Sequence, residues 1–346
     1  MDNFNIKKQC SDSNIIEITK ALIKIFRKCC LSAGLFEENS ISLISHHDKS
    51  IRFTNSTTSV FKSFMSTYGT LDKSNGAFLI QPAMGLQGYN YWIKNNKFGN
   101  FSSFFYSFGT MSAFKDSKEC VQLAYKVVSK IFPLQKDILL YCYYKDTDII
   151  NLVSSNFENV QIIKNTNMKF RHTYGLDNVV GRDALLAYEN NGEKIIYGNI
   201  SIIEIDGIPS FIEFSFDSTL IISALLKEHA VFCLPSVYSI GALDTKNTLD
   251  YKLALCDFLD LLCNLVIEGL DFGSRGRSRN LRKILEEIIE LCKIFDITKD
   301  SLMKMIYDTC KRELTIRKIL KTHTKNIDAD GVVSIVNAEI NQYYNF

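Results

Sequence analysis

The sequence predicts an α+β fold in which an antiparallel sheet with flanking helices is followed by an α-helical domain. Two observations carry this prediction. Apolar runs at residues 138–144, 184–188, 194–205 and 210–216 are typical of strands, and the last two flank Asp206-Gly207, a compact hairpin signal. After Thr219 the apolar residues recur at helical spacing almost to the end of the chain.

The length of 346 residues allows a sizeable core and two domains. Within the helical part the pattern changes character around residues 241–249. We therefore expect the sheet-containing domain at residues 1–240 and the helical domain at residues 241–346.

The other elements follow from local spacing. Residues 15–35 predict a core-facing amphipathic helix, and residues 117–131 predict a second helix. Residues 51–108 alternate short apolar runs with Asn, Ser and Gly, which predicts antiparallel strands and loops, and a small helix and strand are expected before residue 163. The many aromatic residues from 89 to 114 are typical of a buried core, with stacking on nucleic-acid bases as the alternative.

Composition limits the class of protein. The net charge of +2 argues against a uniformly basic nucleic-acid coat but allows a local basic patch. Ten cysteines without a Cys-x-x-Cys pair fit reduced, buried thiols better than disulfides or a zinc site, and His46-His47 is a weak metal candidate, so no metal is expected. There is no signal peptide and no apolar run long enough to span a membrane. We expect a cytoplasmic protein without membrane contact.

Residues 255–292 hold the most informative pattern, an apolar helix followed by a glycine-containing turn and an arginine-rich helix. The apolar face of the second helix is predicted from six residues at helical spacing: Leu281, Ile284, Leu285, Ile288, Leu291 and Cys292. Five cations surround its first turns: Arg275, Arg277, Arg279, Arg282 and Lys283. Cations at a helix N-terminus oppose the helix dipole, so a bound phosphate would suit them. The alternative is pairing with nearby acids, namely Glu268, Asp271, Glu286 and Glu287.

This pattern resembles the tRNA-recognition segment of alanyl-tRNA synthetases. Three further matches occur in the same order: residues 42–62 with Phe53-Thr54-Asn55, residues 81–115 with Phe108-Gly109, and GRDALLAYENNG at 181–192. The chain is therefore similar to this class II synthetase family over residues 15–292. The resemblance implies a class II catalytic-type domain, a helical tRNA-recognition-like domain, and tRNA or aminoacyl-tRNA as partner.

Departures from the family pattern fall in its ATP pocket. In the region that resembles motif 2, which begins at Gln81, Gly85 replaces the arginine that holds the α-phosphate and Tyr106 replaces a glutamate. In the region that resembles motif 3, Thr219 and Leu220 replace a glutamate and an arginine. Losing one preorganised cation typically costs about 2 to 4 kcal/mol of catalysis. Lys94, Lys97 and Arg182 are candidate replacements, or else solvated surface charges.

Glu213 falls where the family's motif 3 aspartate contacts the substrate amino group, so the resemblance implies an amine-binding role for it. The alternative is an edge-strand glutamate facing water, because residues 211–217 alternate apolar and polar side chains. In the arginine-rich turn, Ser274-Arg275 replaces the Asn-Glu pair that reads the acceptor stem, so specific reading of an alanine tRNA is not expected.

Two readings of function remain open. The first is a non-canonical alanyl-tRNA synthetase paralogue, a pseudoenzyme that binds tRNA, an aminoacyl group or a partner protein. The second is an amino-acid-activating or aminoacyl-transferring ligase of specialised metabolism with a rebuilt site, and ATP with Mg²⁺ is implied under this reading only. A structural subunit is a third possibility. No catalytic residue is assigned, and the sequence does not define the oligomeric state.

Overall fold

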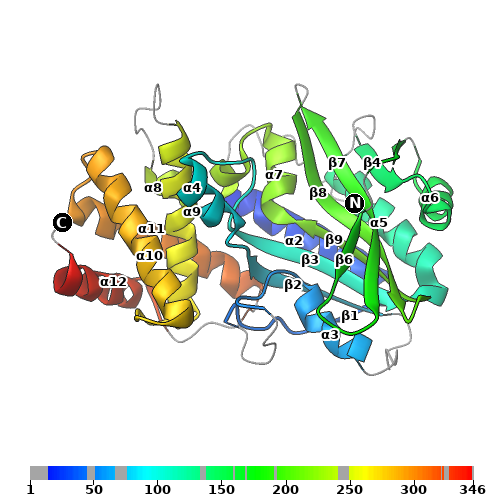
Figure 1. Cartoon of the computed structure of the whole chain (residues 1–346), viewed down its shortest axis with the longest axis horizontal. Helices are drawn as coiled ribbons and strands as arrows, with labels where there is room; N and C mark the ends of the chain where they lie inside the picture. The colour runs from blue at the N-terminus through cyan, green and yellow to red at the C-terminus, as the bar shows by residue number, and fades with distance from the viewer. Residues whose placement is uncertain are drawn as a thin grey trace. The chain divides into compact units, whose positions relative to one another are not determined.

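The computed structural model describes residues 15–44, 51–66, 76–132, 138–158, 160–167, 170–190, 193–240, 249–320, 322 and 327–344 (Figure 1). Its chain forms two compact units, each built from separate stretches of sequence. Unit 1 comprises Met1–Ser40, Ser56–Gln81 and Tyr106–Lys227, and unit 2 comprises Ile41–Asn55, Pro82–Phe105 and Glu228–Phe346. The expected boundary near residue 240 stays a prediction, because residues 241–248 lie outside the described part of the chain.

Most of unit 1 is one sheet. Its strand order is β1-β2-β3-β9-β8-β7-β4-β5, and β6 also pairs with β7. The strands are β1 (Phe36–Glu37), β2 (Ala77–Met84), β3 (Phe104–Ala113), β4 (Ile138–Tyr143), β5 (Gln161–Asn165), β6 (Arg171–Thr173), β7 (Val179–Asn190), β8 (Glu193–Ile205) and β9 (Ile208–Asp217). Neighbours from β3 through β9, β8 and β7 to β4 are antiparallel, whereas β1 with β2 and β4 with β5 are parallel. The predicted antiparallel sheet is confirmed, with a parallel pair near each edge.

The hairpin between β8 and β9 has the predicted turn. Asp206 and Gly207 have φ values of 52° and 76°, and the strands resume pairing at Ile205 and Ile208. Two consecutive positive φ values match the right-handed twist of antiparallel strands, which is why Asp-Gly is favoured here. The turn fixes the register that brings the polar side chains described below into one row.

One face of the sheet is covered by helices with an aromatic core. These helices are α2 (Ile15–Ser32), α5 (Ser117–Ile131) and α7 (Ser218–Leu226), so the predicted helix at residues 117–131 is confirmed. The ring of Phe26 on α2 makes edge contacts with Phe78, Phe108 and Phe216 at centroid distances of 5.7, 5.3 and 5.5 Å. These rings alternate with small and polar residues that point to the opposite face.

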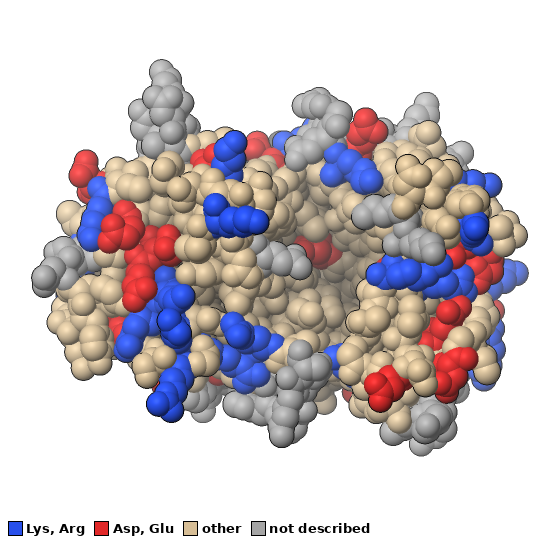
Figure 2. All heavy atoms as spheres, viewed as in Figure 1, with Lys and Arg blue, Asp and Glu red and all other residues tan. Residues whose placement is uncertain are grey.

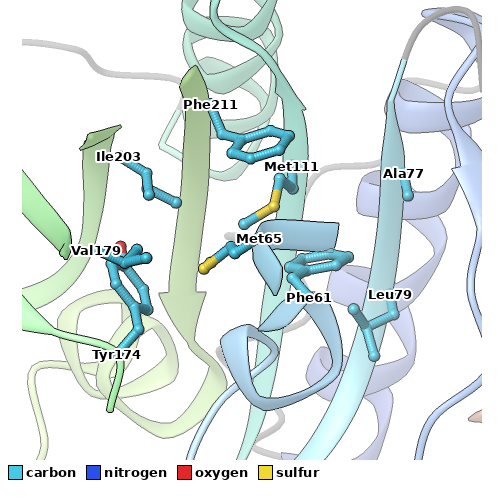
Figure 3. Close-up of a cluster of buried hydrophobic side chains, with 9 residues drawn as sticks. All are labelled: Phe61, Met65, Ala77, Leu79, Met111, Tyr174, Val179, Ile203 and Phe211. Atoms are coloured by element: carbon cyan, nitrogen blue, oxygen red, sulfur yellow. The ribbon is translucent and has the colours of Figure 1, made fainter. Parts of the chain in front are cut away.

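Helix α3 (Thr58–Ser66) packs on that opposite face. Phe61 and Met65, one helical turn apart, join Met111, Phe211 and other buried side chains in the cluster of Figure 3. Gly109 on β3 permits this close approach, since a Cβ there would lie 2.0 Å from the Thr57 hydroxyl oxygen. The prediction of strands and loops for residues 51–108 was therefore incomplete, because tertiary packing of an aromatic, β-branched segment produced a helix.

Charged side chains of both signs are interspersed over the face shown in Figure 2, in keeping with the net charge of +2.

A further helix of unit 1, α6 (Thr147–Ser154), lies between β4 and β5. It and β5 are the small helix and strand that were predicted before residue 163. No described helix combines the length and apolar character needed to cross a membrane.

Unit 2 is mainly helical and confirms the predicted C-terminal helical region. Its principal helices are α4 (Gln87–Asn95), α9 (Leu249–Ile267), α10 (Gly276–Ile294), α11 (Lys299–Leu320) and α12 (Ala329–Tyr343). Every residue of α9 from Leu253 to Ile267 is buried, as expected for the central helix of a bundle. The predicted apolar face of α10 is also buried. The turn after α9 contains Gly269, whose φ of 87° is readily adopted only by glycine.

The thiols of both units are reduced and inaccessible. Nine cysteines are described, and all nine are buried thiols. Cys10, His46, His47 and His323 lie outside the described residues. Within the described residues, no group of three or more His, Cys, Asp or Glu side chains is arranged to hold a metal ion.

Candidate functional site

A row of polar side chains crosses the centre of the sheet in unit 1. Asp183 on β7 pairs with Ser201 on β8, Ser201 pairs with Glu213 on β9, and Glu213 pairs with Met111 on β3. Directly paired residues of neighbouring strands point to the same face. The two carboxylates therefore lie on one face of the sheet, separated by a single serine.

Glu213 is held deep in the fold, with only 1% of its surface exposed. The Thr58 hydroxyl donates a hydrogen bond of 2.8 Å to its Oε1. Burial raises the pKa of Glu213 to about 7, although the Thr58 hydrogen bond and the charge of His172 act in the opposite direction. The alternative of an edge glutamate facing water is wrong: β9 lies between β3 and β8, and the polar alternation marks a buried polar face rather than a solvated one.

A continuous chain of hydrogen bonds runs beside Glu213. Ser215 donates to Asn199 (2.7 Å), the amide of Asn199 donates to Ser201 (2.6 Å), and Ser201 donates to Asp183 (2.5 Å). The second carboxylate oxygen of Asp183 lies 2.8 Å from Nδ1 of His172. Burial by itself would lower the pKa of His172, but the bond to Asp183 and its charge outweigh this and raise it. The chain holds the Asp183 carboxylate in place, and the carboxylate orients the imidazole of His172.

Tyr174 lies on the same face of the sheet, and its hydroxyl is buried. It is 4% exposed, and its hydroxyl oxygen has no hydrogen-bond partner among the described residues. A Cβ on Gly181 would lie 2.7 Å from that oxygen and 2.7 Å from Nε2 of His172. Gly181 therefore leaves the space that both side chains occupy above the sheet. Burial raises the pKa of Tyr174, and the charges of Glu213 and Asp183 raise it further.

The positions that resemble motif 2 are divided between the two faces of the sheet and between the two units. Gln81 is fully buried on β2, and strand alternation places it on the Glu213 face, since Ala77 and Leu79 belong to the cluster of Met111 and Phe211. Tyr106 is buried on β3 but points to the opposite face, because Ser107 pairs with Asp217 on the Glu213 face. Gly85 belongs to unit 2, where its N–H donates to the Ser103 carbonyl at 2.9 Å.

The residues that resemble the end of motif 3 lie at the junction of β9 and α7. Asp217 caps α7, and its Oδ1 accepts hydrogen bonds from the Thr219 and Leu220 amides at 2.7 and 3.2 Å. Burial raises the pKa of Asp217 to about 6, against the effect of these hydrogen bonds. Thr219 is buried and Leu220 half-buried at the start of the helix. Neither residue offers a cation.

Of the suggested replacement cations, only Arg182 belongs to unit 1, and it points away from the Glu213 face. Arg182 lies at even register on β7, away from Asp183, and forms ion pairs with Asp148 at 2.6 Å and Glu204 at 2.7 Å. Asp146 lies 3.7 Å from Arg182 and connects this network to Arg171, with which it pairs at 2.6 Å. Lys94 and Lys97 are exposed residues of unit 2. Arg182 is thus a structural cation, neutralised by its neighbours.

In unit 2 the basic turn before α10 presents three cations to solvent. Arg275, Arg279 and Lys283 are exposed, and none of them forms an ion pair with a described residue. In Figure 2, Lys and Arg side chains gather over the region of α10 and α12. Two of the acids expected to pair with these cations have other partners. Glu268 pairs with buried Arg317 at 2.5 Å, and Glu287 accepts a hydrogen bond from Trp92 at 3.2 Å.

The other two arginines of the turn are occupied. Arg277 donates to the Arg52 carbonyl and lies over the Phe53 ring, 5.9 Å from its centroid. Arg282 pairs with Glu339 at 2.6 Å and lies 4.5 Å from the centroid of Tyr343. The five predicted cations therefore divide into three that are available to a ligand and two that support the bundle.

Sequence reasoning missed most of the polar face around Glu213. Asp183, Ser201, Asn199, Thr58, Tyr174 and His172 were not singled out as site residues. The available signal was polar residues at alternate positions of predicted strands, such as Asn199 and Ser201. Only the register shows that they meet.

Several solved structures of class II aminoacyl-tRNA synthetases are similar to the chain at low identity. Apo histidyl-tRNA synthetase of S. aureus matches with 11% identity and a TM-score of 0.40, over 60% of this chain and 65% of that one. Asparaginyl-tRNA synthetase of Pyrococcus horikoshii matches with 11% identity and a TM-score of 0.35, over 66% of each chain. The RNA binding domain of threonyl-tRNA synthetase from Cryptosporidium parvum Iowa II matches with 10% identity and a TM-score of 0.40, over 93% of this chain and 90% of that one. No family model and no curated protein sequence matches the chain.

Proposed function

We propose that this chain is a non-canonical, alanyl-tRNA synthetase-like protein that binds the ammonium group of an amino-acid or aminoacyl ligand at Glu213 and RNA at the basic turn of α10, without standard ATP-dependent activation. The observation that carries the proposal is the buried carboxylate of Glu213 on the central strand, in one row with Ser201 and Asp183. The motif matches of the sequence support the alanyl assignment.

The energetics of burial favour a cationic ligand at Glu213. A buried carboxylate is costly unless it is paired with a cation or well hydrogen-bonded. Among the described residues, Glu213 accepts one hydrogen bond from Thr58 and forms no ion pair with Lys or Arg. An ammonium group would supply the missing charge through a short, charge-assisted hydrogen bond. The pKa of Glu213 is raised to about 7 because the buried carboxylate has no ammonium group to neutralise its charge.

The basic turn favours RNA because its exposed cations stand at the wrong end of a helix. Arg275 and Arg279 lie in the cap and first turn of α10, where the helix dipole disfavours positive charge. A phosphate backbone would neutralise both cations and release counterions, and this release supplies much of the affinity of proteins for nucleic acids. With Ser274 and Arg275 in the turn, this recognition would be independent of sequence.

Activation by ATP is not supported by the residues present. The positions that correspond to the phosphate-holding arginines are Gly85 and Leu220. Preorganised cations usually give the strongest stabilisation of a developing phosphoryl charge, so their loss would slow adenylation by several orders of magnitude.

A second function, an aminoacyl-transferring ligase with a rebuilt site, is favoured by one observation. The imidazole of His172 is oriented by Asp183 at 2.8 Å, as general bases commonly are. In such a ligase His172 would accept a proton from an attacking amine. A protein partner remains compatible with either function.

Binding of an amine probe to matched variants tests the proposal. We expect Glu213→Gln to weaken binding of L-alaninamide by about 1 to 3 kcal/mol, the usual value of a hydrogen bond to a charged group. Glu119→Gln, an exposed glutamate on α5, is the control and should leave the dissociation constant unchanged. Ligand-observed NMR titration suits weak binding. An identical dissociation constant for Glu213→Gln and the wild type would place the amine elsewhere.

A further inference from the structure

The sheet face around Glu213 has an unbalanced charge. The strand residues nearest to Glu213 on this face, assigned by register and alternation, include carboxylates but no lysine or arginine: Ala77, Leu79, Gln81, Ser107, Gly109, Met111, Gly181, Asp183, Leu185, Asn199, Ser201, Ile203, Phe211, Glu213, Ser215 and Asp217. Lys194 lies farther along β8 on the same face, over the Tyr141 ring at 3.5 Å from its centroid, and Lys62 is a half-buried residue of α3. Glu213 and Asp183 lie at its centre, and Asp217 adds a third acid at the end of β9. Asp183 is paired with His172 and accepts a hydrogen bond from Ser201. This face suits a positive group and disfavours a further negative one.

A free amino acid would bring such a negative group with it. Its carboxylate is attached to the same carbon as its ammonium group, so an ammonium bound at Glu213 would hold the carboxylate close to Glu213 and Asp183. Like charges that close are unfavourable, and more so away from water. An ester or amide of the same amino acid has a neutral carbonyl in place of the carboxylate.

Two buried hydroxyl groups are placed to meet that neutral oxygen. Neither the Tyr174 hydroxyl nor the Thr57 hydroxyl has a hydrogen-bond partner among the described residues. Tyr174 lies over Gly181, in the row of Ile203 and Phe211, and Thr57 lies over Gly109, in the row of Ser215. Glu213 occupies the row between these two on β9. An orphaned donor on either side of the carboxylate is the arrangement that an amine with a nearby neutral acceptor would satisfy.

The surroundings of the Tyr174 hydroxyl differ from those of Tyr197, another buried tyrosine whose hydroxyl has no hydrogen-bond partner among the described residues. For Tyr197, burial is the cause that raises the pKa. For Tyr174, the charges of Glu213 and Asp183 contribute to the raised pKa as well. The hydroxyl of Tyr174 therefore lies within the field of the two carboxylates, and Tyr197 provides a matched control.

We propose that this site takes α-amino esters and amides, the chemical form of an aminoacyl group already joined to its carrier, in preference to free amino acids, with Glu213 binding the ammonium and Tyr174 donating to the neutral acyl oxygen. The inference rests on the proposed amine-binding role of Glu213 and adds the class of ligand. It places the protein after an activation step, as a binder or acceptor of aminoacyl groups made elsewhere.

Three small probes test the ester and amide preference separately from the amine site: ethylamine, L-alanine and L-alaninamide. Each is titrated into the full chain and followed by ligand-observed NMR. The dissociation constants are corrected for the protonated fraction of each amine. We expect alaninamide to bind at least tenfold more tightly than alanine. Tyr174→Phe should weaken alaninamide about tenfold, to the level of ethylamine, while ethylamine binding stays unchanged. Tyr197→Phe should leave all three unchanged.

The outcomes are distinguishable. Alanine binding as tightly as alaninamide, or an alaninamide affinity that ignores Tyr174→Phe, overturns the ester and amide preference while leaving the amine site in place. Binding of none of the three probes, or binding insensitive to Glu213→Gln, overturns the proposed amine site itself. Thermal unfolding of Tyr174→Phe and Tyr197→Phe checks that both variants fold, as expected for removal of hydroxyls that make no hydrogen bond with described residues.

Discussion

At the scale of single residues, Glu213 links the stability of the fold to the chemistry of its site. Its pKa is raised by burial from 4.5 to about 7. Below the lower value the group is protonated in folded and unfolded chains alike, and its contribution to stability is fully present. Between the two values the unfolded chain loses its proton first, so rising pH destabilises the folded state until the folded group also ionises.

Glu213→Gln should therefore make the protein more stable at pH 8 while changing it little at pH 4. The gap between 4.5 and about 7, at about 1.4 kcal/mol per pH unit, sets an upper limit of about 3 to 4 kcal/mol. Urea unfolding of both proteins at the two pH values measures the difference. Equal destabilisation by Glu213→Gln at both pH values would show that the glutamate contributes to packing, and that its ionised form does not destabilise the fold.

The same carboxyl predicts the pH dependence of amine binding. As pH falls below about 7, Glu213 takes up a proton and loses the charge that attracts an ammonium group. We expect the affinity for alaninamide to fall about tenfold per pH unit below this value, since one protonation is involved. In Glu213→Gln this dependence should be absent. A wild-type affinity that stays constant from pH 7 to pH 5 would contradict the assignment.

At the scale of elements, the basic turn of α10 gives a prediction that distinguishes its arginines. Arg275 and Arg279 are exposed and form no described ion pair, whereas Arg282 is paired with Glu339. Each of the first two, changed to alanine, should reduce the slope of log affinity against log salt by about one unit or slightly less for an acceptor-stem RNA. Arg282→Ala should reduce it less. Lys293→Ala at the other end of α10 is the control.

Fluorescence anisotropy at several salt concentrations measures these slopes. Because the contacts are to phosphates, alanine and non-alanine tRNAs should weaken to the same extent. RNA binding that is absent at low salt, or that ignores both substitutions, would remove the nucleic-acid role and favour the ligase or a structural role.

Elements also show what sequence reasoning reaches. The hairpin of β8 and β9 was predictable, because Asp206-Gly207 specifies its turn through local backbone preferences. The polar row was not, because Asp183, Ser201 and Glu213 are brought together only by the pairing of their strands. Glu213 was identified by resemblance, but its burial depends on strands and helices that cover both faces of the sheet. Helix α3 was missed for a similar reason, as its aromatic residues favour a strand locally and a helix only in place.

At the scale of the whole molecule, the proposed similarity to alanyl-tRNA synthetases aligns Gly85 and Leu220 with two phosphate-holding arginines, and this predicts no ordinary formation of alanyl adenylate. Alanine-dependent exchange of pyrophosphate into ATP should therefore be undetectable beside a working synthetase assayed in parallel. Robust exchange with alanine would overturn this prediction. Exchange with a different amino acid would instead support the ligase and would identify its substrate.

The burial of the thiols makes the cysteines internal reporters of motion. Cys29, Cys30, Cys120 and Cys142 belong to unit 1, and Cys233, Cys256, Cys263, Cys292 and Cys310 belong to unit 2. A thiol reagent reaches each of them only when the surrounding structure opens, so its labelling rate measures the local opening equilibrium. Mass spectrometry of labelled peptides would thus give a separate opening free energy for each unit. If an aminoacyl ligand orders the sheet, the four thiols of unit 1 will be protected by it while those of unit 2 respond to RNA.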